Sequence, residues 1–77
     1  MGKRLVMAVG SSIRHFRKSY DMSQEELAAK AGLDRTYISG VERGVRNITL
    51  ESMELIVDAL GVSTQSFLTK VSEEIDS

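Results

Sequence analysis

The sequence predicts an all-α domain of five short helices, and three observations support this class. Apolar residues recur at steps of three and four along most of the chain, as they do on one face of a helix. Ser, Asp or Thr precedes four of these apolar runs, where a side-chain oxygen can cap a helix. Gly follows several runs, and Gly is the usual residue at a left-handed helix end. A chain of 77 residues has room for one domain, residues 1–77.

The first predicted helix covers residues 1–20. Its apolar stripe consists of Leu5, Val9, Ile13, Phe16 and Tyr20. Gly10 and the two serines after it lower the helix propensity of the middle. The start of this helix is therefore open between the N-terminus and Gly10.

Residues 24–44, QEELAAKAGLDRTYISGVERG, predict two short helices around a tight turn. Ser23 and Glu26 have the spacing of a capping box at the start of the first helix. Gly32 suits the left-handed end of that helix, and Asp34 suits the cap of the second.

A steep crossing of these two helices requires a small residue at the contact. Ala28 is small, and Gly32 lacks a Cβ at the turn. Ile38 and Val41 would then fix the second helix onto the first. This is a helix-turn-helix, in which the second helix enters the major groove of DNA and reads bases.

The exposed side of the second helix carries the candidate base contacts. Arg35 can bind guanine O6 and N7 with two parallel hydrogen bonds, and Thr36 suits a thymine methyl or a phosphate. Ser39 lies one turn further along the same face, with Arg43 beside it. Gly40 lowers helix propensity, which indicates either a close approach to DNA or a neighbouring helix, or a tolerated imperfection.

The segment resembles the helix-turn-helix of the XRE/Cro-type, phage-repressor-like family. The matching residues are Gln24, Leu27, Ala28, Ala31, Gly32, Leu33, Ile38 and Val41. The longer string LDRTYISGVERGVRNITLESMELIVDALGV resembles the controller proteins of restriction–modification systems, and the similarity covers residues 9–68. The resemblance implies a compact five-helix phage-repressor-like domain that binds double-stranded DNA.

Two further interpretations depend on this resemblance. In such repressors an Arg at the position of Arg17 pairs with a Glu at the position of Glu42, so we expect a structural ion pair rather than an Arg17–phosphate contact. Gln24, at the first turn of its helix, would contact a phosphate or brace a side chain of the recognition helix.

Arg46 and Asn47 follow the recognition helix and are expected to bind the sugar–phosphate backbone. Tyr37 is expected at the edge of the core with a free hydroxyl, and a phosphate hydrogen bond is its second interpretation. The predicted DNA-binding residues are Gln24, Arg35, Thr36, Tyr37, Ser39, Arg43, Arg46 and Asn47.

The C-terminal part predicts two more helices. Thr49 caps the first, Gly61 ends it, and Ser63 caps the last. The first has the core stripe Leu50, Met53, Ile56, Val57 and Leu60, and the last carries Phe67, Leu68, Val71 and Ile75. This is more apolar surface than one small core absorbs, so residues 49–75 are expected to form a homodimer through Leu55, Phe67, Leu68 and Val71. Simple core filling is the alternative, and residues 73–77 are expected to fray.

Charge is divided along the chain. Residues 1–48 hold nine Lys and Arg against five Asp and Glu, whereas residues 49–77 hold one against six. The basic part is expected to face phosphates, and the acidic part to face away from them. Solvated helix faces are the plainer explanation of the acidic part.

Other functional classes find little support. His15 is the only histidine and there is no cysteine, so we expect no metal site, no cofactor and no enzyme activity. The sequence has no membrane-spanning or secretory segment, which predicts a cytoplasmic protein.

The resemblance implies a homodimeric regulator of transcription that acts on a near-palindromic operator. Like controller proteins, it would control its own gene and a restriction endonuclease gene, and it would contact RNA polymerase when activating. The alternatives are a phage-type repressor or an antitoxin-type protein with the same DNA-binding fold.

Overall fold

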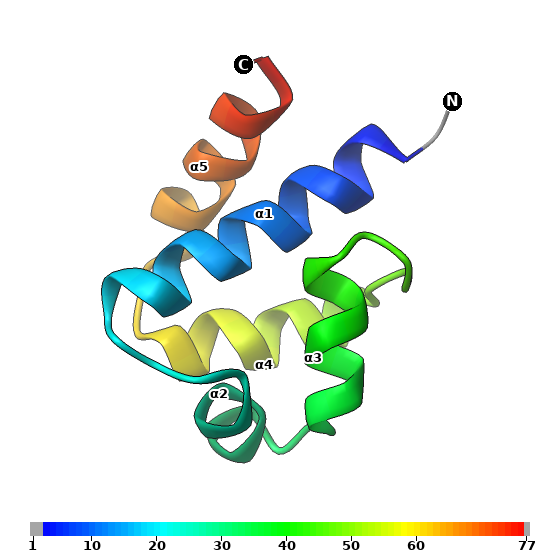
Figure 1. Ribbon diagram of the computed structural model, residues 1–77. Coiled ribbons are helices and arrows are strands. Elements are labelled where there is room, and N and C mark those ends of the chain that lie inside the picture. Colours follow the sequence, from blue (N-terminus) through cyan, green and yellow to red (C-terminus); the bar gives the residue numbers. More distant parts are fainter. Residues whose placement is uncertain (1–2, 77) are drawn as a thin grey trace.

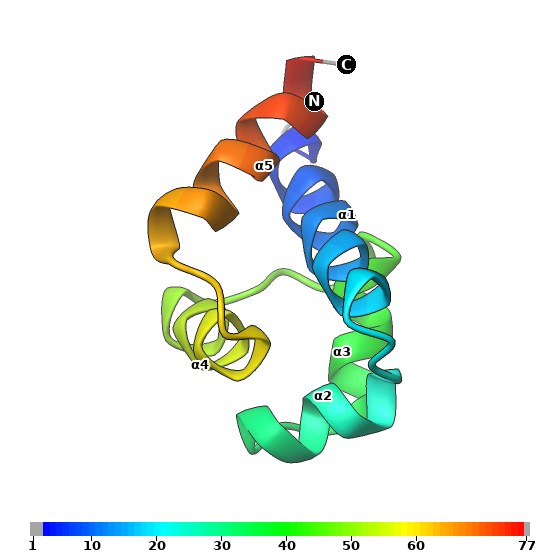
Figure 2. The same ribbon diagram turned by 90° about the vertical axis from the view of Figure 1, so that its left-hand side faces the viewer.

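The computed structural model describes residues 3–76, which contain five α-helices and no strand. The helices are α1 (Arg4–Ser19), α2 (Gln24–Ala31), α3 (Arg35–Glu42), α4 (Leu50–Leu60) and α5 (Thr64–Asp76). α1 runs through the middle of the molecule, between α5 on one side and α3 on the other (Figure 1). α2 packs against both α3 and α4 and lies at the end of the molecule away from the start of α1 and the end of α5 (Figure 2). The predicted all-α class is confirmed.

The predicted helix starts and ends are present. Ser23 Oγ accepts a hydrogen bond from the Glu26 N–H at 3.0 Å, and the Glu26 carboxylate accepts one from the Ser23 N–H at 2.8 Å. The other capping side chains are those of Asp34, Thr49 and Ser63. Gly32 and Gly61 end α2 and α4 with φ of 71° and 76°. These local signals fix where the helices lie along the chain.

The core joins all five helices. Its largest fully buried side chains are Phe67, Ile13, Leu27, Ile38, Ile56 and Val41. Burying a side chain of this size contributes about 1.5–3 kcal/mol. The predicted stripes were wrong for Leu5, Tyr20 and Leu50, which are exposed. Leu5 and Leu50 lie in the first turn of their helices, and Tyr20 directly follows the end of α1.

The structure defines one helix start that the sequence left open, and it differs from the prediction at the C-terminal end. α1 begins at Arg4 and continues through Gly10, which is buried against the end of α3. A Cβ on Gly10 would overlap the carbonyl oxygen of Val41, so the glycine permits a close helix crossing. The predicted fraying from residue 73 was wrong up to Asp76, because α5 stays helical to that residue. Residues 1–2 and 77 lie outside the described part of the chain.

Candidate nucleic-acid interface

The turn between α2 and α3 is tight and hydrogen-bonded. The Leu33 N–H donates to the Ala28 carbonyl at 2.9 Å across the left-handed Gly32. Ala28 is buried, as the close crossing of α2 and α3 requires. Ile38 and Val41 are buried on the inner side of α3. This packing holds α3 in one orientation, with its opposite side in solvent.

The outer side of α3 presents cations and hydroxyls. Arg35, Thr36 and Arg43 are exposed, and Ser39 is half-buried among them. The Arg43 Nε donates to the Ser39 carbonyl at 3.4 Å. Neither arginine is paired with a carboxylate of residues 3–76. These groups have the chemistry to donate to guanine edges and phosphate oxygens.

A carboxylate at the end of α3 ties three helices together. The Arg17 Nε and Nη2 donate to the two oxygens of Glu42 at 2.7 and 2.9 Å, so the predicted ion pair is present. The Arg17 Nη1 donates to the Met22 carbonyl at 2.9 Å. The hydrogen bond to Glu42 raises the pKa of Arg17 above its ordinary value. With its guanidinium used in this way, Arg17 serves a structural role.

Gln24 supplies the third contact to the same carboxylate. Its Nε2 donates to Glu42 Oε1 at 3.0 Å. Of the two roles predicted for Gln24, this is the bracing of a recognition-helix side chain. The network positions the start of α2 and the end of α3 relative to α1.

The segment after α3 packs back onto that helix. The Arg46 guanidinium carbon lies 5.1 Å from the centre of the Tyr37 ring, a cation–π distance. The prediction of a free Tyr37 hydroxyl was wrong, because this oxygen accepts a long hydrogen bond of 3.4 Å from the Thr49 N–H. Asn47 is exposed between these contacts. No sequence pattern indicates the Arg46–Tyr37 contact, since it depends on the path of the loop.

The predicted dimer residues fall into two groups. Phe67 and Val71 lie in the core of the single chain, so their assignment to an interface was wrong. They face inward because α5 packs along α1. Leu55 and Leu68 are exposed.

Of the two exposed residues Leu55 and Leu68, only Leu68 lines a groove between α4 and α5. Its lining includes Leu50, Met53, Val57 and Leu68, whereas Leu55 does not line it. Leu50 is 80% exposed and was missed because its spacing fits the core stripe. The side chains that make this surface apolar are therefore partly different from those predicted.

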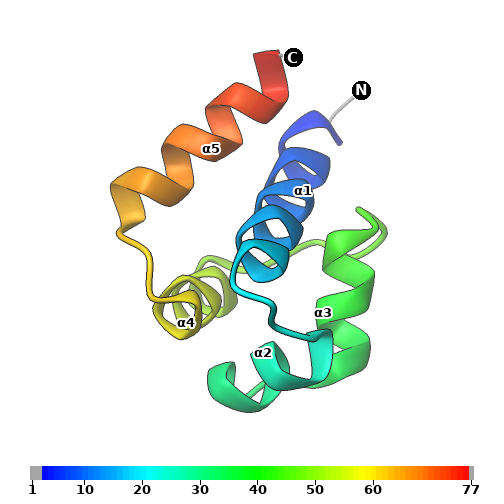
Figure 3. The same cartoon turned by 60° about the vertical axis from the view of Figure 1, so that its left-hand side comes forward.

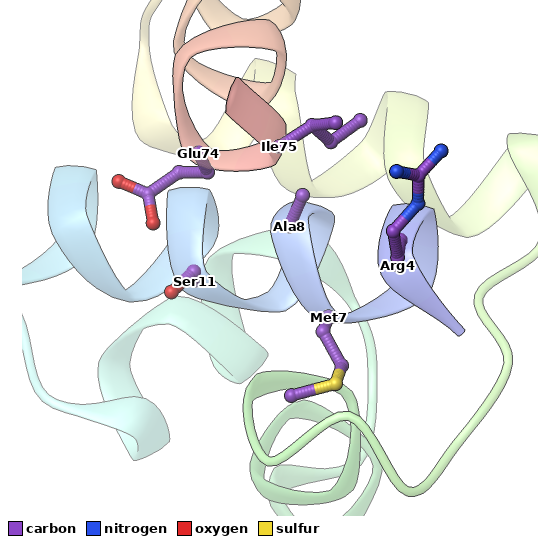
Figure 4. A pocket seen from close by; sticks show the side chains of 6 residues that line it. All are labelled: Arg4, Met7, Ala8, Ser11, Glu74 and Ile75. Atoms are coloured by element: carbon purple, nitrogen blue, oxygen red, sulfur yellow. The ribbon is translucent and has the colours of Figure 1, made fainter. Parts of the chain in front are cut away.

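A second depression lies between the N-terminal half of α1 and the end of α5. Arg4 and Glu74 stand at opposite ends of it, with Ala8 and Ile75 between them (Figure 4). A hydrogen bond from Lys70 lowers the pKa of Glu74. Within residues 3–76, no three His, Asp or Glu side chains are grouped as metal ligands. None of the five helices in this part of the chain has the length and hydrophobicity to span a bilayer.

The model of the helix-turn-helix family matches residues 13–67. The chain belongs to the helix-turn-helix family. It is 44% identical over 69 residues to control protein C.BamHI of Bacillus amyloliquefaciens, covering 88% of this chain and 85% of that protein. It is 40% identical over 62 residues to control protein C.SmaI of Serratia marcescens, covering 80% and 74%.

The fold is also similar to that of a solved relative. The restriction–modification controller protein C.Esp1396I, as a tetramer in complex with its natural 35-base-pair operator, matches with a TM-score of 0.90. The two chains are 45% identical, and the match covers 95% of this chain and 96% of that one. The predicted resemblance to controller proteins is confirmed.

Proposed function

We propose that this chain is a sequence-specific DNA-binding regulator of transcription that acts as a homodimer on a near-palindromic operator. The observation that carries the proposal is the orientation of α3. Ile38 and Val41 are buried behind it, and Arg35 and Thr36 face solvent near its N-terminal end. Recognition helices contact bases through these N-terminal residues. The crystallised complex of C.Esp1396I with its operator supports the same use of the fold here.

Within this proposal the residues divide by role. Arg35 reads a guanine, and Thr36 and Ser39 reach the same groove floor. Arg43, Arg46 and Asn47 contact the sugar–phosphate backbone and set the register of the protein on the duplex. The remaining two predicted residues position other side chains. Gln24 does so through its hydrogen bond to Glu42, and Tyr37 through its contact with Arg46.

The α4–α5 groove is the proposed dimer surface. Leu50 and Leu68 place exposed apolar side chains at its rim, where a second copy would cover them. α1 lies between α5 and α3, so pairing through this groove leaves both recognition helices at the outside of the dimer (Figure 3). The longest dimension of one chain is 31 Å. Two such units can place their recognition helices about 34–36 Å apart, one turn of DNA.

The relatives support a more specific biological role. Like the controller proteins it resembles, this chain would regulate its own gene and a restriction endonuclease gene, and contact RNA polymerase when activating. It would act in the cytoplasm, without enzyme activity. The proposed signal is the concentration of the regulator itself.

A footprint on the DNA upstream of its own start codon tests the proposal. We expect protection of two half-sites related by a near-palindrome, with centres one helical turn apart. Uniform binding to all DNA would contradict sequence-specific regulation. Size-exclusion chromatography with the product of the neighbouring gene separates the antitoxin alternative, since a regulator should remain a homodimer that ignores its neighbour.

A further inference from the structure

We infer that Gly40 is a positioning residue that holds Arg46 ready for a DNA phosphate. The inference rests on the proposed function, because it assigns a purpose to the contact between α3 and the loop that follows. Gly40 lies inside α3 and is buried. Its φ is not positive, unlike that of Gly32, Gly44 and Gly61. The conformational freedom of glycine therefore does not explain its presence here. The explanation must be the absence of a Cβ atom.

The backbone of Gly40 anchors the loop. Its carbonyl oxygen accepts hydrogen bonds from the Val45 N–H at 3.0 Å and from the Arg46 N–H at 3.3 Å. The left-handed Gly44 makes the reversal that brings these two N–H groups back to α3. The main chain of Arg46 is thus attached directly to the helix that would enter the groove.

The bare Cα of Gly40 makes room for the Arg46 side chain. A Cβ at position 40 would lie 2.5 Å from Arg46 Cγ and 3.4 Å from its Cβ. The first separation is too short, so any larger residue at position 40 would displace the base of the Arg46 side chain. A glycine within a helix is less stable than an alanine, and the room needed by Arg46 explains why a glycine is nevertheless present at position 40.

Tyr37 holds the other end of the same side chain. Its ring lies 5.1 Å from the Arg46 guanidinium carbon, and its hydroxyl is bonded to the Thr49 N–H. Arg46 has no carboxylate partner among residues 3–76, and it is exposed. Its charge is therefore fixed in place but not neutralised. Ordering the side chain before binding reduces the entropy that a DNA contact would cost.

Gly40→Ala, Arg46→Ala and the double variant test the inference in a cycle on operator DNA. We expect Gly40→Ala to weaken binding about three- to tenfold in the wild-type background, the factor for losing one pre-ordered side chain. In the Arg46→Ala background the same change should have no effect. Equal weakening in both backgrounds would overturn the inference, since Gly40 would then act without Arg46.

Proton NMR of the protein without DNA gives an independent readout. The Tyr37 ring should shift the Arg46 side-chain protons upfield, and Gly40→Ala should abolish that shift. An unchanged shift would overturn the inference. This readout remains decisive if the chain binds no operator, an outcome that would refute the proposed function instead. If Gly40→Ala fails to fold, the double variant should recover folding because the clash is gone, and failure to recover would count against the proposal.

Discussion

Arg17 and Glu42 join the first helix to the end of the recognition helix through two parallel hydrogen bonds of 2.7 and 2.9 Å. Their side chains are only 10% and 2% exposed. A pair so well removed from water is costly to break, because the remaining charge is left without a partner. The orientation of the DNA-facing surface therefore depends on a contact made behind it.

Glu42→Ala should lower the free energy of unfolding by about 3 kcal/mol, because Arg17 would remain partly buried without its carboxylate. Urea unfolding measures the change. Lys70→Ala is the control, since it breaks the more exposed Lys70–Glu74 pair and should cost about 0.5 kcal/mol. Similar losses in the two variants would show that the buried pair contributes no more to the free energy of unfolding than the exposed pair does.

Arg35→Ala should weaken binding to the cognate site by about 1–3 kcal/mol and relax the preference at one base position. The reason is that a guanidinium can make two hydrogen bonds to guanine, which Ala cannot replace. Binding to a set of single-base operator variants measures both effects. An equal loss on random DNA would reassign Arg35 to the backbone contacts.

Arg46→Ala should weaken binding to all sequences to a similar extent. It removes one cation from the phosphate contacts, so the slope of log K against log salt should become less steep by about 0.9. A titration at several salt concentrations measures this slope. If the slope stays the same, Arg46 does not contact phosphate.

Leu68→Glu should raise the dimer dissociation constant about tenfold or more, because a half-exposed leucine at the α4–α5 groove would lose its apolar contact with the partner. Sedimentation equilibrium measures the constant. Leu5→Glu changes a leucine that is 58% exposed, against 47% for Leu68, and that does not line the groove, so it should leave the dimer intact. A dimer that is insensitive to Leu68→Glu would require a different interface.

Phe67→Ala provides the contrasting case on the same helix. Phe67 is completely buried within the single chain, so its truncation should lower the free energy of unfolding by about 3–5 kcal/mol. Thermal unfolding measures the loss. An unfolding temperature equal to that of the wild type would contradict this role in the core.

Glu26→Gln should reduce the loss of stability in acid. Hydrogen bonds from the Ser23 backbone and side chain lower the pKa of Glu26 below its ordinary value of 4.5. The ionised carboxylate therefore stabilises the fold above that value, and this contribution disappears as pH falls through the lowered pKa. Urea midpoints measured from neutral pH downwards show the difference, and identical profiles for wild type and variant would contradict it. Glu25→Gln, a neighbouring exposed carboxylate, should leave the acid effect in place.

The sequence predicted the order of the helices and their boundaries to within a few residues. Helix boundaries depend on backbone groups close by in the chain, as at Ser23, Gly32 and Asp34. They can therefore be predicted without knowledge of the tertiary structure. The Arg17–Glu42 pair was predicted from the family resemblance, since 25 residues separate its partners.

The sequence by itself determined which segments are helical and which face of α3 carries Arg35 and Thr36, because capping and apolar spacing operate within one or two turns. Only the tertiary structure decided that Phe67 and Val71 are interior while Leu50 is exposed. Burial depends on where other helices lie, and the same apolar spacing fits a core or a dimer surface. The contact of Gly40 with Arg46 was also beyond the sequence, because it exists only after the loop has folded back onto α3.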